Sequence, residues 1–299
     1  MAILGAAFVA RALIVDWPRA SGLLAEASLG WLALALSFSV VSLSGIACVW
    51  TISLGYFLPS VTLAEGLRWY FPGELGKYVP GGVWALLGRA ELAVRGGVTR
   101  PAAYAATIWS LAATYSAAFV LIAVTLPSHS ALHNLSAPSR IAAALVLGVL
   151  ASSVIFVPTI ISRVRLPLFG RFALLGRYLI PVNEIGTGRL MTLIALSIPT
   201  WFGMGAATWF VTVALDVSIP LSEVLFATSA AWLIGFLVLP APSGIGVREA
   251  VFVAALTSVS PGTASAIAII ARVVSMAADV VGALLSFMFA SRKLTGTQL

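Results

Sequence analysis

Charged residues are scarce in this chain. They make up 9% of its 299 residues, whereas hydrophobic residues make up 61%. Because a soluble domain usually carries roughly a quarter charged residues, this composition excludes an ordinary soluble fold and indicates an integral membrane protein. The net charge is +7, but the basic side chains gather in short segments between apolar runs. That pattern argues against a nucleic-acid partner and fits cytoplasmic loops beside anionic lipid head groups.

Cysteine, histidine and aspartate are also scarce. The single cysteine, Cys48, excludes an internal disulfide framework and a cysteine-based zinc cluster. His129 and His133 have no third ligand nearby, so we predict no bound metal. The few aspartates are isolated, which argues against the paired-carboxylate site of a metal-dependent glycosyltransferase. The chain also lacks a Gly-x4-Gly-Lys-Ser/Thr loop, so we predict no ATPase and no cofactor.

Long apolar runs, by contrast, are abundant and predict an all-α polytopic membrane protein. About 20 apolar residues in a helix suffice to cross a bilayer. The clear runs are 28–54, 102–126, 141–161, 190–215 and 264–290. Trp31 and Trp50 lie near the two ends of the first run, the usual place of aromatic anchors. Residues 1–15 are apolar but short, and we interpret them as a short or truncated first span. We expect about six to seven spans in a single transmembrane domain over residues 1–299.

Two further apolar stretches, 60–96 and 223–259, are interrupted by proline, glycine and charged residues. The positive-inside rule assigns the basic segments 89–100 and 162–189 and the C-terminus to the cytoplasm. Counting the crossings between these segments requires each interrupted stretch to enter and leave on one side. The first stretch enters from the cytoplasm and the second from outside. We therefore predict two re-entrant helical hairpins of opposite orientation.

The predicted order of span, hairpin and span occurs twice, at about 28–126 and about 190–290, with the span 141–161 as the link. The two breaks are similar in sequence. Pro80-Gly81-Gly82-Val83, followed by Gly88-Arg89-Ala90-Glu91, corresponds to Pro242-Ser243-Gly244-Ile245-Gly246-Val247-Arg248-Glu249. Inverted repeats with broken helices are typical of transporters, whose binding site lies where the broken helices meet. The sequence therefore predicts an inverted-topology repeat.

A helix that begins inside the membrane presents unpaired N–H groups and the positive end of its dipole, which together favour an anion. Each break is followed by an arginine, Arg89 or Arg248, whose planar guanidinium suits phosphate. Our hypothesis is a phosphate held at depth, with an apolar tail among the helices. The candidate substrate-binding residues are Arg89, Arg248, Glu249, Glu91, Gly81, Gly82, Gly244, Gly246, Lys77, Glu74, Arg272 and Asp279.

A purely structural interpretation of the same charges stays open. Arg89 could pair with Glu91, and Arg248 with Glu249, only to hold each hairpin together. Arg272 and Asp279 are seven residues apart on one helix face, so they could equally form a structural interhelical pair.

At these breaks the chain resembles the transmembrane, flippase-like domain family of lysylphosphatidylglycerol synthases and their stand-alone relatives. The resemblance rests on Pro80-Gly81-Gly82-Val83-Trp84 with Gly88-Arg89, and on the segment from Pro242 to Ala250. It implies a membrane domain that moves phospholipid or polyprenyl-phosphate-linked head groups between leaflets. On the matching motif positions it implies roles for Arg89, Arg248 and Glu249. The synthases add a soluble aminoacyl-transfer domain, and we expect a stand-alone member without it.

We therefore expect a lipid flippase or transporter, not an enzyme, that moves an anionic phospholipid or a polyprenyl-phosphate-linked sugar between leaflets. We expect it in the plasma (inner) membrane of a bacterium, with its C-terminus in the cytoplasm. One alternative is a membrane enzyme acting on a lipid-phosphate head group, with Glu249 or Glu91 as general base. Another is a scaffold subunit for a glycosyltransferase partner. The transport hypothesis makes a geometric demand, which is that Arg89 and Arg248 face a shared cavity from opposite sides.

Overall fold

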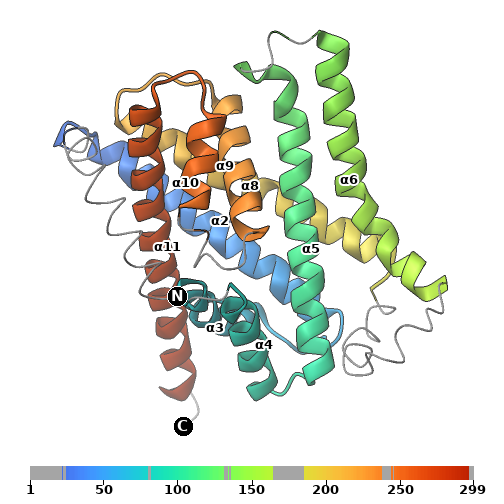
Figure 1. Ribbon diagram of the computed structural model, residues 1–299. Coiled ribbons are helices and arrows are strands. Elements are labelled where there is room, and N and C mark those ends of the chain that lie inside the picture. The colour runs from blue at the N-terminus through green and yellow to red at the C-terminus, as the bar shows by residue number, and fades with distance from the viewer. Residues whose placement is uncertain are drawn as a thin grey trace.

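The computed structural model describes residues 22, 25–79, 82–130, 134, 136–163, 185–237, 244 and 246–295. All regular elements in these ranges are helical (Figure 1). In chain order they are α2 (Leu29–Gly55), α3 (Leu63–Glu74), the 3-10 helix η1 (Leu75–Tyr78), α4 (Trp84–Arg95), α5 (Arg100–Thr125), the 3-10 helix η2 (Leu126–Ser128), α6 (Ala137–Arg163), α8 (Thr187–Ala214), α9 (Leu221–Leu237), α10 (Val247–Ala255) and α11 (Pro261–Thr295).

Within the described residues, four stretches of helix are long and apolar enough to cross a membrane. They are Leu29–Gly55, Arg100–Ser128, Thr187–Ala214 and Pro261–Phe287. Shorter apolar helices cover Ala137–Leu150 and Leu221–Leu237. The prediction of an all-helical, membrane-embedded protein is confirmed. The total of about six to seven spans stays a prediction, and the segment 1–15 lies outside the described residues.

α2 and α8 cross the middle of the molecule side by side (Figure 1). Their contact is close because small residues face each other. A Cβ on Gly203 would lie 2.3 Å from Oγ of Ser42, and one on Gly45 would lie 2.6 Å from Cγ2 of Thr200. Lipid tails are as apolar as leucine, so membrane helices associate through such close packing and through buried hydrogen bonds. α5 packs against both helices.

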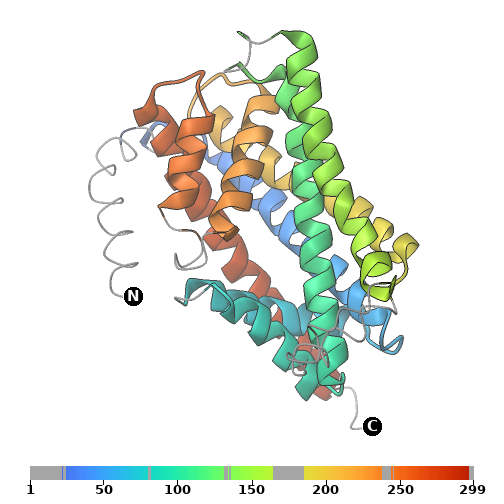
Figure 2. The same cartoon turned by 45° about the vertical axis from the view of Figure 1, so that its right-hand side comes forward.

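Two helical hairpins approach the middle of the molecule from opposite ends. The first hairpin consists of α3, η1 and α4, and the second consists of α9 and α10. In Figures 1 and 2 the first hairpin lies at the end where α11 finishes, and the second lies towards the end where α11 begins. Opposed hairpins are what the predicted inverted arrangement requires. Entry of the hairpins into the membrane and the repeat itself stay predictions.

The first hairpin is packed backbone to backbone at Gly73. A Cβ on Gly73 would lie 2.5 Å from the backbone N of Arg89 and 2.7 Å from its Cα. A Cβ on Gly88 would lie 3.3 Å from Cα of Gly73. Backbone atoms cannot move aside as the end of a flexible side chain can. Glycine at position 73 therefore sets how closely α4, and with it Arg89, lies against α3.

Replacing Gly73 with alanine should destabilise the protein by roughly 1–3 kcal/mol, because the new methyl group overpacks a backbone contact. The measurement is the midpoint of thermal unfolding in detergent, followed by tryptophan fluorescence. Gly30→Ala in α2 is the matched control, since a Cβ there meets no atom within 4 Å. Its midpoint should stay the same or rise slightly, as alanine favours helix over glycine. Equal midpoints for wild type and Gly73→Ala would contradict the close packing.

Candidate anion-binding site between two helical hairpins

Side chains from both hairpins line one cavity in the middle of the molecule, with a volume of about 120 Å³. One water molecule needs roughly 10–15 Å³ of cavity volume. The cavity therefore has room for a phosphate-sized group. The charged and glycine residues that line it are Glu74, Lys77, Gly82 and Arg89 from the first hairpin, and Gly235, Gly244 and Arg248 from the second. The other walls come from α2, α5 and α8.

Arg89 reaches this cavity from α4, and its side chain is only 4% exposed. Its Nη1 lies 4.0 Å from Oε2 of Glu74, which is the limit of an ion pair. The guanidinium also lies 5.1 Å from the ring centre of Tyr70 and 5.9 Å from that of Trp50. Such aromatic faces attract a cation without using its hydrogen-bond donors. Nε of Arg89 is buried and has no hydrogen-bond partner among the described residues.

Arg248 reaches the same cavity from α10, in the opposite hairpin. Its guanidinium lies 3.3 Å from the ring centre of Trp232, and its Nε has no hydrogen-bond partner in the part of the chain that the structure describes. Glycines make room for its stem, because a Cβ would lie 2.2 Å (Gly235) or 2.9 Å (Gly244) from Cγ of Arg248. Gly244 also has φ +65°, which residues with side chains rarely adopt. As the sequence predicts, the two arginines face a shared cavity; their role in binding stays a prediction.

Glu249 ties α10 to α11. One carboxylate oxygen accepts a hydrogen bond of 2.6 Å from the backbone N–H of Gly246, and the other pairs with Nη1 of Arg272. The carboxylate thus caps the start of α10, which is the usual role of glutamate at the third helical position. The structure therefore does not pair Glu249 with Arg248, the structural alternative that the sequence left open. The N–H group of Gly246 is also already occupied by the protein.

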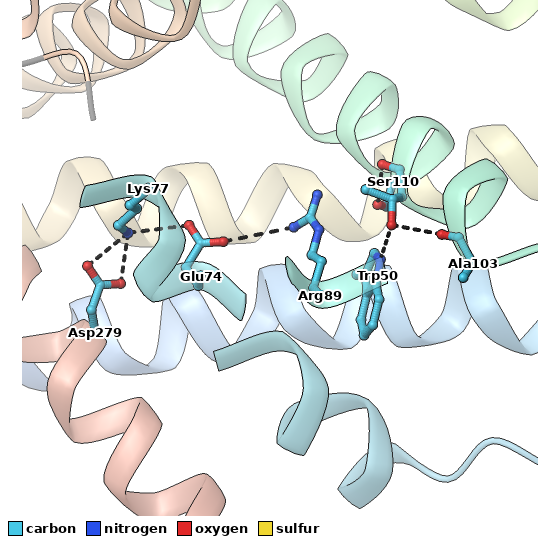
Figure 3. Close-up of polar contacts among 8 residues, drawn as sticks. Trp50, Glu74, Lys77, Arg89, Ala103, Ser110 and Asp279 are labelled. Atoms are coloured by element: carbon cyan, nitrogen blue, oxygen red, sulfur yellow. Dashed lines mark hydrogen bonds and ion pairs between the residues drawn. The ribbon is translucent and has the colours of Figure 1, made fainter. Parts of the chain in front are cut away.

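A row of alternating charges runs along the first hairpin to α11 (Figure 3). Nζ of Lys77 lies 2.8 Å from the Asp279 carboxylate and 3.3 Å from Oε1 of Glu74. The Tyr78 hydroxyl donates to the same Asp279 carboxylate at 2.5 Å. Asp279 and Arg272 therefore do not pair with each other. Each binds a different hairpin, so α11 tethers both hairpins near the cavity.

Glu91 lies away from the cavity, contrary to its predicted role as a binding residue beside Arg89. Its carboxylate accepts hydrogen bonds from Arg100 at 3.0 Å and from the Tyr104 hydroxyl at 2.8 Å. These hydrogen bonds hold the pKa of the Glu91 carboxyl below its ordinary value. The prediction fails for a geometric reason. Arg89 and Glu91 are two residues apart on α4, and residues two apart on a helix do not face each other. Another candidate, Gly81, lies outside the described residues.

Comparison with protein families fits this arrangement of broken helices. The family described as the lysylphosphatidylglycerol synthase TM region matches residues 2–282 of the chain. The chain belongs to this family. The resemblance inferred from the two glycine-containing breaks is thereby confirmed, and membership indicates a lipid-related role in a membrane. A search of curated proteins gave no match.

In this member of the lysylphosphatidylglycerol synthase TM family, aromatic residues form much of the cavity wall. They are Trp50, Tyr70, Tyr115, Trp201, Trp232 and Phe236. The sequence pattern predicts none of them as a cavity residue, and it predicts Trp50 as an interfacial anchor. Trp50 is instead fully buried, and its indole N–H donates to Oγ1 of Thr107 at 2.9 Å. The sequence feature that points to buried aromatic residues is the number of tryptophans, which is nine. Interfacial anchoring alone does not explain so many.

Proposed function

We propose that the protein moves an anionic lipid between leaflets, either a phospholipid or a polyprenyl-phosphate-linked sugar, without an ATPase of its own. The observation that carries this proposal is the pair of arginines at one cavity, one from each of two opposed hairpins. Both guanidinium groups line this cavity, and among the described residues neither buried Nε has a hydrogen-bond partner.

A phosphate in this cavity would accept charge-assisted hydrogen bonds from both guanidinium groups. The aromatic walls suit the less polar parts of a head group, and an apolar tail would lie among the spanning helices. If the hairpins are re-entrant, movement of either one would open the same site to one side of the membrane. That is how transporters built from inverted repeats achieve alternating access.

We also propose that the protein lies in the plasma (inner) membrane of a bacterium with its C-terminus in the cytoplasm. Arg292 and Lys293 follow the last apolar run closely, and such positive residues favour the cytoplasmic side. A cysteine placed at the C-terminus should then react with a membrane-impermeant thiol reagent only after the cells are opened. Labelling in intact cells would overturn this orientation.

The test of transport uses purified protein in vesicles that contain a lipid with a fluorescent head group. A membrane-impermeant reductant bleaches only the outer leaflet of protein-free vesicles. With the protein present, we expect the label from both leaflets to be bleached. Bleaching confined to the outer leaflet, for both classes of lipid, would overturn the proposal.

The same vesicles distinguish the alternatives. A new covalent lipid product, detected by mass spectrometry, would favour a membrane enzyme. The engagement of Glu249, the candidate general base, with Arg272 and Gly246 supports transport over that alternative. Inactivity of the pure protein, together with stable co-purification of a glycosyltransferase, would favour the scaffold.

A further inference from the structure

The charged side chains near the hairpin ends form a cluster whose charges do not cancel. Seven of them line three adjacent pockets that share Trp232 and Arg248. We call this set the charge cluster; its cations are Lys77, Arg89, Arg248 and Arg272, and its anions are Glu74, Glu249 and Asp279. Among the described residues, four cations face three carboxylates, which leaves one net positive charge. The segments 80–81 and 238–243, outside the described residues, contain no ionisable side chain and leave this balance unchanged.

The surplus positive charge lies at the cavity. Asp279 pairs with Lys77, and Glu249 pairs with Arg272. Glu74 lies between Lys77 at 3.3 Å and Arg89 at 4.0 Å. Within the described ranges, no carboxylate lies at ion-pair distance from Arg248, whose Nε also lacks a hydrogen-bond partner. The guanidinium of Arg248 therefore has the largest unmet capacity for an anion.

We propose that the charge cluster selects a singly charged phosphodiester over a doubly charged phosphomonoester or a diphosphate. This inference rests on the proposed function, because it takes the ligand of the cavity to be a phosphate group. One negative charge makes the cluster neutral. A second negative charge would remain uncompensated in a site away from bulk water, where an unpaired charge is costly. The selectivity thus follows from the total charge of the site, in addition to its shape.

Two lipids with identical tails test this selectivity. Phosphatidylglycerol carries one phosphate charge, and phosphatidic acid carries close to two in weakly alkaline solution. We expect the full-length protein in detergent to bind phosphatidylglycerol at least about tenfold more tightly at about pH 8.5. The preference should vanish at about pH 5, because a phosphomonoester with a second pKa near 6 is then singly charged. Unchanged binding of phosphatidylglycerol between these pH values checks that the cluster itself has not titrated.

The second part of the test uses variants that change the net charge of the charge cluster but keep the shape of the side chain. Glu74→Gln and Glu249→Gln each raise the cluster to two net positive charges and should remove or reverse the preference at about pH 8.5. Because the two variants lie in different hairpins, the test still holds if one of them misfolds. Glu65→Gln in α3 is the matched control, because glutamine preserves the capping box that Glu65 forms with Thr62. It should keep the wild-type preference.

A soluble phosphodiester, glycerophosphoglycerol, identifies the source of the ligand. Competition with the lipid supports recognition of the head group alone, and retained lipid selectivity without competition supports recognition of a lipid-borne phosphodiester.

Equal binding of the two lipids by wild type at both pH values, or an unchanged preference in both cluster variants, would overturn the inference. Binding with the expected preference but without translocation would refute the flippase proposal alone. Translocation without preference would refute the charge selection alone.

Discussion

Arg248→Ala should lower the rate of lipid translocation by about 10- to 100-fold, since a hydrogen bond to a charged group contributes roughly 1.5–3 kcal/mol. The loss is expected because Arg248 carries the surplus charge at the cavity and has no competing carboxylate partner among the described residues. The measurement is the rate at which an impermeant reductant bleaches a head-group label in vesicles of matched protein content.

Two further variants show whether the loss is specific. Arg248→Lys keeps the charge but loses the planar array of donors, so its rate should lie between those of wild type and Arg248→Ala. Arg95→Ala removes an exposed arginine from the last turn of α4, outside the cavity lining, and should translocate at the wild-type rate. Wild-type transport by Arg248→Ala would remove this residue from the mechanism.

Asp279→Ala should produce the largest loss of stability, about 3–5 kcal/mol, which is typical when one partner of a buried ion pair is removed. The Asp279 side chain is 2% exposed and serves both Lys77 and the Tyr78 hydroxyl. Without it, the Lys77 ammonium group keeps only Glu74, at 3.3 Å, among the described carboxylates, and the Tyr78 hydroxyl loses its acceptor. α11 also loses a tether to the first hairpin. The measurement is the thermal unfolding midpoint in detergent, followed by tryptophan fluorescence.

A double variant separates the loss of the ion pair from general disruption of the fold. Asp279→Leu with Lys77→Met should recover much of the stability, because replacing both partners by apolar groups is often close to neutral. Glu91→Gln weakens a more exposed ion pair, with Arg100, and should leave the midpoint nearly unchanged because water and salt screen such pairs. If Asp279→Ala and Glu91→Gln gave equal midpoints, the stabilising role of the buried pair would be disproved.

Helix geometry argues against two pairings that the sequence analysis left open as structural alternatives. Neighbours one or two apart on a helix do not face each other, which argues against pairing Arg248 with Glu249 or Arg89 with Glu91. The structure agrees, since Arg248 lies against Trp232 while Glu249 turns to Arg272 on α11. The pairing of Lys77 with Asp279 is different. Those residues are 202 positions apart, and no local spacing predicts their contact.

An all-helical membrane protein and the positions of its two breaks follow from the sequence. Hydrophobic runs set where a chain can cross lipid, and proline and glycine act locally on the backbone. It also placed Arg89 and Arg248 shortly after those breaks. The folded structure shows which charges pair, that Glu91 lies outside the cavity, and that Trp50 and Trp232 line it. The physical reason is that ion pairs and cavity walls depend on how distant helices cross, whereas spans and breaks depend on neighbours along the chain.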